Sequence, residues 1–176
     1  MTNLNFRHAT HDDINAIVAL VQSAYRGDAS RAGWTTEADI LDGQRIDASM
    51  LQAMLANPAA TFLLAARDGT LIACCELQHN GDAAYFGMFS VVPTEQGSGI
   101  GKVVLAEAER MVRDEWLCSR LEMTVIDVRD ALIAWYERRG YIRTGLHSPF
   151  PYGDTRYGIP LRDDLRFETL RKTFLR

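Results

Sequence analysis

Two turn signals, Asp68-Gly69 and Asn80-Gly81, constrain the fold of this chain more than any other feature of its sequence. They separate three apolar segments, which cover residues 61–66, 71–78 and 84–92. Asp-Gly and Asn-Gly are favoured in two-residue hairpin loops, because the central positions of these turns need positive φ. We therefore expect three antiparallel strands in sequence order, with Pro93 closing the third.

Further strand and helix patterns flank this unit on both sides. The expected elements, in order, are a strand at 4–7, a helix opened by Thr10 and Asp13 that breaks at Gly27, a helix at 47–56, the three strands, a helix from Ile100, a strand at 121–126, a helix at 131–139 ended by Gly140, a strand at 141–144, a loop at 147–160 and a helix from about Leu165. Residues 27–46 are less periodic. This order predicts a mixed α/β fold with one parallel crossover near its middle.

The length of the chain limits its number of domains, and its net charge limits the kinds of partner it can bind. A chain of 176 residues is long enough for one domain, which we place at 1–176 with a motif-bearing core at about 4–144 and a C-terminal loop and helix at 145–176. The net charge of −4 gives no support for nucleic-acid binding. Basic residues in 166–176 alternate with acidic and apolar ones, which indicates a solvated helix face.

The spacing of the cysteines and the lengths of the apolar segments indicate the cellular compartment in which the protein works. Cys74, Cys75 and Cys118 have no CxxC spacing, which favours free thiols in a reducing cytoplasm and no metal site. The first residues contain no apolar run of a signal peptide, and no stretch is long enough to span a membrane. We therefore expect a cytoplasmic protein without a membrane partner.

The segment Gln96 to Lys102 follows a predicted strand and opens a predicted helix. Glycines at 97, 99 and 101 let backbone N–H groups approach an anion, and a helix N-terminus adds unpaired N–H groups and a positive dipole end. The segment matches neither GxxxxGK followed by Ser or Thr nor GxGxxG. It is therefore a phosphate-binding loop of another kind, or a glycine-rich turn that binds nothing.

Gln96-x-x-Gly99-x-Gly101, after Val91-Val92-Pro93, resembles the acyl-CoA signature of the GCN5-related N-acetyltransferase (GNAT) family. The resemblance implies a mostly antiparallel central sheet with one splayed parallel strand pair and flanking helices. It also implies acetyl-CoA as acyl donor, with no metal. The backbone of Gln96, Gly97, Ser98, Gly99, Ile100 and Gly101 would bind the pyrophosphate, and Lys102 would either add charge or remain solvated.

The same resemblance assigns the strand at 84–92 to the pantetheine arm. Amides near Phe89, Ser90 and Val91 would bind the arm and polarise the thioester carbonyl, as preset donors do in an oxyanion site. The alternative is a buried strand with ordinary pairing on both sides. The sequence alone does not distinguish the two.

Trp135 to Tyr141 resembles the family's Leu-Tyr-Glu-x-x-Gly-Phe segment. The family uses this tyrosine to protonate the departing thiolate, a role that we carry to Tyr136; the alternative is a structural tyrosine packed on the sheet. The chain departs from the family at Arg129, where Asn is common seven residues before the tyrosine.

The acceptor side carries weaker signals. Glu76, next to His79 and Tyr85 on the expected strands, is the candidate base, unless it is only a partly exposed strand residue. Trp34 and Glu37 lie in the region that commonly walls the acceptor site in the family, and Glu37 would pair with a cationic amine. Residues 149–157 are rich in aromatics and predict a lid or a packed turn, with Arg156 as a contact for an acceptor carboxylate.

We therefore expect an N-acetyltransferase that moves an acetyl group to a primary amine of a small molecule or peptide in a ternary complex. The alternative is an acyl-CoA sensor or interaction domain without chemistry, and a weaker one is a nucleotide-binding protein. Cys74 and Cys75 lack a partner nearby in sequence, which disfavours a covalent acyl-cysteine. Polyamines, amino acids, aminoglycosides and protein N-termini remain open as acceptors. A homodimer is common among similar proteins, and no pattern in this sequence favours or excludes one.

Overall fold

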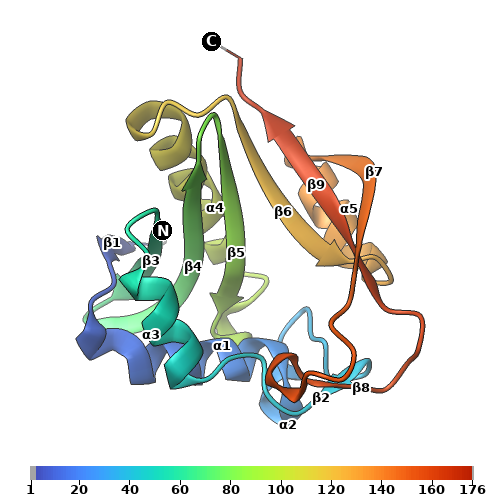
Figure 1. The fold of residues 1–176 in the computed structure, drawn as a ribbon. Coiled ribbons are helices and arrows are strands. Elements are labelled where there is room, and N and C mark those ends of the chain that lie inside the picture. Colours follow the sequence, from blue (N-terminus) through green and yellow to red (C-terminus); the bar gives the residue numbers. More distant parts are fainter. Residues whose placement is uncertain (1–2, 176) are drawn as a thin grey trace.

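The computed structural model describes residues 3–175, which form a seven-stranded sheet in the order β1-β3-β4-β5-β6-β9-β7 (Figure 1). The strands are β1 (Asn5–His8), β3 (Ala60–Arg67), β4 (Thr70–Asn80), β5 (Ala83–Val91), β6 (Arg120–Ile126), β7 (Ile142–Pro149) and β9 (Arg166–Thr173). Every neighbouring pair is antiparallel except β5 and β6. The expected mixed, mostly antiparallel sheet with one parallel pair is confirmed.

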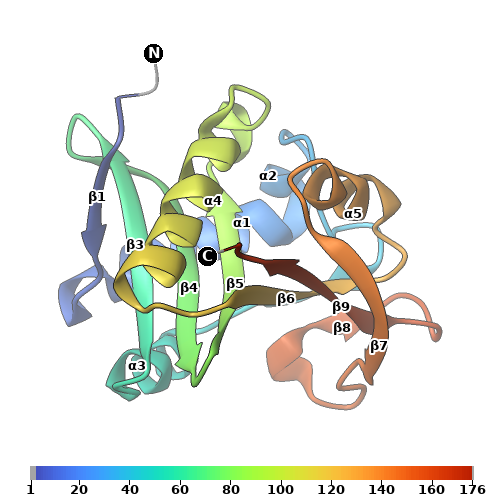
Figure 2. The same cartoon turned by 90° about the horizontal axis from the view of Figure 1, so that it is seen from above.

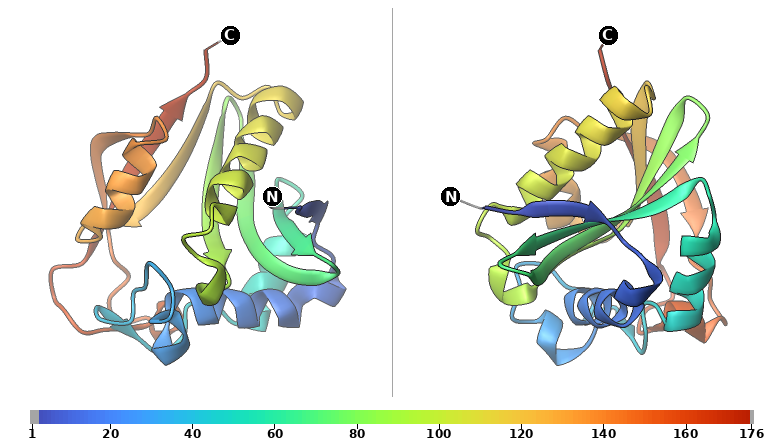
Figure 3. Two further views of the ribbon diagram at one scale, coloured as in Figure 1. Left: turned by 180° about the vertical axis from the view of Figure 1, so that it is seen from behind. Right: turned by 90° about the vertical axis from the view of Figure 1, so that its left-hand side faces the viewer.

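Helices cover both faces of this sheet (Figure 3). The helices α1 (Ile14–Tyr25) and α3 (Ala48–Ala56) lie on one face, and α4 (Ile100–Arg110) and α5 (Asp130–Glu137) lie on the other. The short α2 (Gly27–Ser30) follows α1, and β2 (Leu41–Asp42) pairs with β8 (Ile159–Pro160) in a second, two-stranded sheet.

The side chains of β3 show how the sequence fills both layers. Phe62 and Leu64 belong to the buried cluster under α1 and α3, whereas Leu63 and Ala65 belong to the cluster under α4 and α5. Successive strand residues point to opposite faces, so a continuous apolar run is required where both faces are covered. This explains why the central strands lack a polar alternation.

Both hairpins form where the turn signals predict them. Asp68 and Gly69 take φ values of 52° and 78°, and Gly81 takes 67°. The ends of these three strands differ from the expected ranges by only one or two residues, because the turns fix where each strand begins and ends. The helix expected at Thr10 begins with a 3-10 turn at His11–Asp13, in which the Asp13 carboxylate accepts the Thr10 N–H at 2.8 Å.

The helix expected from about Leu165 is wrong, because Arg166–Thr173 is strand β9. It lies between β6 and β7 and pairs with both. Phe167, Leu170 and Phe174 have helical spacing, but the buried positions are Glu168, Leu170 and Phe174, which are two or four residues apart. The loop expected at 147–160 is also shorter, because β7 continues to Pro149.

The parallel pair separates along its length. Only Ala83, Ala84 and Tyr85 of β5 pair with β6, at Arg120, Leu121 and Glu122. Beyond these residues the two strands diverge, and Figures 1 and 2 show the opening between them. The rest of β5 therefore has an edge without a strand partner, which is the splay that the family resemblance implies.

Candidate functional site

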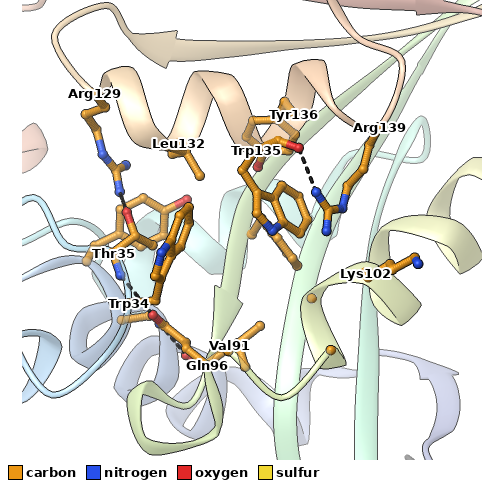
Figure 4. Close-up of a pocket in the computed structure, with 16 residues that line it drawn as sticks. Trp34, Thr35, Val91, Gln96, Lys102, Arg129, Leu132, Trp135, Tyr136 and Arg139 are labelled. Atoms are coloured by element: carbon orange, nitrogen blue, oxygen red, sulfur yellow. Dashed lines mark hydrogen bonds between the residues drawn. The ribbon is translucent and has the colours of Figure 1, made fainter.

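The first of two adjoining cavities lies beside the free part of β5 and has a volume of about 280 Å³ (Figure 4). Its walls come from the end of α1, the segment after α2, β5, the glycine loop and α5. The lining residues are Ala24, Tyr25, Trp34, Thr35, Phe89, Val91, Gln96, Gly97, Gly99, Gly101, Lys102, Arg129, Leu132, Trp135, Tyr136 and Arg139.

The glycine loop forms one wall of this cavity through its backbone. Gly97 and Gly99 take φ values of 83° and 90°, and Gly99 caps the N-terminus of α4. No atom lies within 4 Å of a Cβ built at either position, so the backbone faces open space. Ile100 is buried and anchors the helix start in the core. The loop therefore combines exposed backbone with the positive end of a helix, as an anion site requires.

Gln96 has a different part in the loop from its neighbours. Its side-chain amide donates to the Val91 carbonyl at 3.1 Å and accepts the Thr35 N–H at 3.1 Å. A Cβ at Gly33 would lie 2.4 Å from the Gln96 Oε1, so a larger residue there would displace the Gln96 side chain. The glutamine thus ties the segment after α2 to the end of β5, while Ser98 is exposed and donates to the Glu95 carbonyl at 2.5 Å.

Three cations line the same cavity, Lys102, Arg129 and Arg139, and the first and last of these form no salt bridge within residues 3–175. The Arg139 guanidinium lies 3.6 Å from the Trp135 ring centroid and donates to the Trp135 carbonyl at 2.8 Å. Its Nε is the one buried side-chain polar atom without a hydrogen-bond partner in residues 3–175. Burial and the neighbouring Arg138 lower the pKa of Arg139. Two cations beside the exposed backbone of the glycine loop fit a diphosphate or phosphate ligand.

The free edge of β5 supplies further donors. Val92 donates its N–H to Ile72 of β4 at 2.9 Å. Because successive N–H groups of a strand point to opposite sides, those of Phe89 and Val91 point to the open edge, whereas that of Ser90 points to β4. A bulge opposite Cys75, with Met88 at a φ of 49°, bends the strand here.

The second cavity, of about 340 Å³, lies within the opening between β5 and β6. Its lining residues are Tyr25, Arg26, Glu37, Arg45, Met54, Glu76, Gln78, Tyr85, Phe86, Gly87, Met88, Phe89, Met123, Thr124, Val125, Ile126, Arg129, Leu132, Tyr136, Phe150, Pro151, Tyr157 and Phe167. The aromatic segment at 149–157, predicted as a lid or packed turn, thus contributes Phe150, Pro151 and Tyr157 to the wall.

Tyr136 lines both cavities and lies where they meet. Its ring is held edge-on by Trp135 at 5.1 Å and by Tyr141 at 5.7 Å between centroids. None of the hydrogen bonds within residues 3–175 uses its hydroxyl, and burial raises its pKa well above the ordinary value. The phenol is therefore protonated at neutral pH and available to a ligand.

Glu76 lies in the second cavity, on β4, and is only 2% exposed. The Gln78 side-chain amide donates to its Oε1 at 2.5 Å, and a Cβ at Gly87 would lie 3.3 Å from its Oε2. Burial raises the pKa of Glu76, against the smaller opposing effects of Gln78 and Arg45. A carboxylate with a raised pKa is better suited to accept a proton near neutral pH.

Glu37 is also buried, but two arginines use its carboxylate. Arg26 donates to Oε1 at 3.0 Å and Arg129 donates to Oε2 at 3.0 Å. Arg129 also donates to the Thr35 hydroxyl at 2.7 Å. The predicted pairing of Glu37 with a cationic amine therefore meets a carboxylate that is already neutralised. No sequence pattern marks Arg26 as a functional residue, whereas Arg129 is the position at which this chain differs from the family pattern.

The remaining predicted residues are divided between the two cavities and the surface. Trp34 is half exposed and lines the first cavity, not the second. Tyr85 lines the second, where its hydroxyl lies 3.2 Å from that of Thr124. Arg156 lies outside both, exposed and paired with Asp154 at 2.6 Å. His79 also lies outside both and stacks on Trp116.

The cysteines take no part in either cavity. Cys74 is fully buried, and burial raises its pKa to about 12, so its thiolate is not formed at neutral pH. Within residues 3–175 no three His, Cys, Asp or Glu side chains are grouped as metal ligands. No helix in this range has the length and hydropathy of a membrane span.

A family model described as the acetyltransferase (GNAT) family matches residues 15–141. This range includes the splayed strands, the glycine loop and Tyr136. No curated protein sequence shows significant similarity to the chain.

Solved structures of acetyltransferases are similar over nearly the whole chain. A structure described as a putative phosphinothricin N-acetyltransferase has a TM-score of 0.72 at 16% identity, covering 99% of this chain and 100% of that one. A ribosomal-protein-alanine N-acetyltransferase from Brucella melitensis has a TM-score of 0.69 at 20% identity, covering 97% of this chain and 99% of that one. A GNAT family acetyltransferase from Elizabethkingia anophelis with acetyl-CoA bound has a TM-score of 0.70 at 13% identity, covering 99% of this chain and 100% of that one. At these identities the similarity establishes the shared fold.

Proposed function

Because the chain belongs to the acetyltransferase (GNAT) family, we propose that it transfers an acetyl group from acetyl-CoA to a primary amine by direct attack in a ternary complex. The observation that carries this proposal is the junction of the two cavities. The first has the donors and cations that suit a pyrophosphate, the second has a buried carboxylate, and Tyr136 lies between them.

The first cavity binds acetyl-CoA in this proposal, and its residues fit that ligand. The backbone of Gly97 to Gly101 donates to the pyrophosphate, and Lys102 and Arg139 neutralise its charge. The presence of acetyl-CoA in one similar structure supports the choice of ligand. Phe89 and Val91 direct their N–H groups toward the free edge of β5, where they hydrogen-bond the pantetheine arm and the thioester carbonyl.

The second cavity binds the amine, and two side chains move the protons. Glu76, directly or through a water, accepts the proton that the amine loses as its nitrogen bonds to the acetyl carbon. Tyr136 donates a proton to the sulfur as the carbon–sulfur bond breaks. The raised pKa keeps Tyr136 protonated until negative charge develops on sulfur.

Tyr136→Phe tests this assignment. We expect kcat to fall by about 10²-fold or more, with little change in the dissociation constant of acetyl-CoA, because the hydroxyl acts only as the sulfur departs. Tyr141→Phe is the matched control, since its hydroxyl is also in a buried setting but donates to Glu109 at 3.0 Å, outside both cavities. An unchanged kcat in Tyr136→Phe would reject the acid role.

A panel of primary amines assayed for thiol release separates the enzyme from its alternatives. Saturable binding of acetyl-CoA with no turnover on any amine would favour a non-catalytic acyl-CoA sensor. Stabilisation of the protein by ATP but not by CoA, in a thermal-shift experiment, would favour a nucleotide-binding protein.

A further inference from the structure

The charged groups of the second cavity do not balance. Arg26, Arg45 and Arg129 line it together with Glu37 and Glu76. Glu37 is bonded to both Arg26 and Arg129 at 3.0 Å, so this trio retains one positive charge. Arg45 adds a second, and Glu76 contributes at most one negative charge. The cavity is therefore positive or, with Glu76 protonated, more strongly positive.

Among the described residues of this cavity, Arg45 is the cation that makes no hydrogen bond or salt bridge to a carboxylate, although its charge acts on nearby Glu76. No salt bridge or side-chain hydrogen bond within residues 3–175 involves its guanidinium, whereas Arg26 and Arg129 both bind Glu37. Its guanidinium lies 5.1 Å from the Tyr25 ring centroid, and its backbone N–H is fixed by Gln22 at 2.9 Å. A half-buried guanidinium held on an aromatic face keeps its donors available to a ligand.

We propose that the acceptor is an amine that also carries a carboxylate, as an amino acid does, and that Arg45 binds this carboxylate. The inference rests on the proposed function, because it places the amine near Glu76 and Tyr136. Arg45 and Glu76 line one cavity of about 340 Å³, which suits an acceptor whose charged groups are a few bonds apart.

The uncharged walls of the cavity suggest the rest of the acceptor. Apolar and aromatic side chains predominate there, including Met54, Phe86, Met88, Met123, Phe150 and Phe167. Such a wall favours an apolar body between the amine and the solvent side. Polyamines and aminoglycosides carry several positive charges. Among the carboxylates of residues 3–175 that line this cavity, Glu76 is the one without a salt bridge to an arginine, so these acceptors are disfavoured.

Matched acceptors test the proposal. Phenylalanine, phenylalaninamide and phenethylamine share an apolar body and an amine, but only the first has a carboxylate. With the wild-type protein we expect kcat/KM for phenylalanine to exceed that for the other two by about 10- to 100-fold. Equal or better use of the amide or of phenethylamine would overturn the proposal.

Arg45→Gln should remove this preference by raising KM for phenylalanine alone, without changing the dissociation constant of acetyl-CoA. KM for phenylalanine in Arg45→Lys should lie between those of wild type and Arg45→Gln, because lysine keeps the charge and loses the bidentate geometry. Arg162→Gln is the control, since Arg162 is exposed, pairs with Asp164 at 2.6 Å and lies outside both cavities. A preference that survives in Arg45→Gln would contradict the role of Arg45.

Binding separates this inference from the proposed chemistry. Calorimetric titration of the CoA complex with the three compounds should give heat for phenylalanine, weaker binding for the other two, and loss of the difference in Arg45→Gln. This result would support the anion site even if no amine is acetylated. Absence of selective binding would overturn the anion site even if another amine, such as spermidine, is turned over.

Discussion

The two cavities differ in how the chain builds them. In the first, the wall that we propose to bind the pyrophosphate comes from one continuous segment, the glycine loop and the start of α4, and offers mostly backbone. The second draws on α1, the segment before α3, β4, β5, β6, α5 and the segment around Phe150, and offers side chains. The glycine-loop wall of the first cavity is a local motif, whereas the polar groups of the second come together only when distant segments meet.

This difference is reflected in how each cavity is held together. Gly97 and Gly99 need only a permissive backbone, and Ile100 anchors them in the core. The second cavity depends on a buried network in which Glu37 binds Arg26, whose guanidinium also donates to the Tyr157 carbonyl at 3.3 Å. A backbone site tolerates change around it, but a side-chain site depends on each partner in the network.

The largest expected effect comes from Glu37→Ala. It leaves the side chains of Arg26 and Arg129, 2% and 10% exposed, without their carboxylate. We expect a loss of about 3–5 kcal/mol in the free energy of unfolding, because an uncompensated buried charge is costly. Urea denaturation measures it, and KM for the amine should rise more than the dissociation constant of acetyl-CoA.

Glu107→Ala is the control for that variant. Its pair with Arg110 is more exposed, with side chains 24% and 43% accessible, and should contribute less than about 1 kcal/mol. Equal losses in the two variants would mean that the buried network does not hold the second cavity together.

A smaller effect is expected from Gly97→Ala. A side chain at a φ of 83° costs roughly 1–2 kcal/mol, with no steric clash to add to it. The strain should weaken acetyl-CoA binding about tenfold and leave the choice of amine unchanged. Gly81→Ala imposes similar strain at a φ of 67° in the β4–β5 turn. If both variants weaken acetyl-CoA binding equally, the glycine loop is not the anion site.

The smallest effect concerns the pH dependence of stability. Burial raises the pKa of Glu76, because it disfavours the charged carboxylate. The folded protein therefore has its full stability below the ordinary pKa of glutamate and loses part of it as pH rises through the raised pKa. Glu76→Gln removes this loss. Its melting temperature should therefore rise relative to wild type between about pH 5 and about pH 8.

Glu168→Gln gives the opposite sign. The side-chain hydrogen bond from Arg143 lowers the pKa of Glu168, so its stabilisation is present above the ordinary pKa and is lost as pH falls. This variant should lose most relative to wild type at the higher pH. If the two variants respond to pH in the same direction, the environment assigned to Glu76 is wrong.

Local signals account for the parts of the fold that the sequence predicts. The Asp68-Gly69 and Asn80-Gly81 turns fix the β3–β4–β5 unit, and the glycine loop is found where its pattern places it, ahead of α4. The sequence did not predict strand β9, because the spacing of Phe167, Leu170 and Phe174 also fits a helix. The neighbours β6 and β7 decide between the two, because their edges need a strand partner for their backbone groups.

By itself the sequence determined the central hairpins, the position of the glycine loop and the likeness of the Trp135 to Tyr141 segment to the family pattern. These features depend on backbone conformation within a few residues, which side chains specify directly. Only the tertiary structure engaged Glu37 with two arginines, left Arg45 without a salt bridge and placed Arg156 outside the cavities. The charge available to a ligand depends on which partners meet in space, and chain order does not encode this locally.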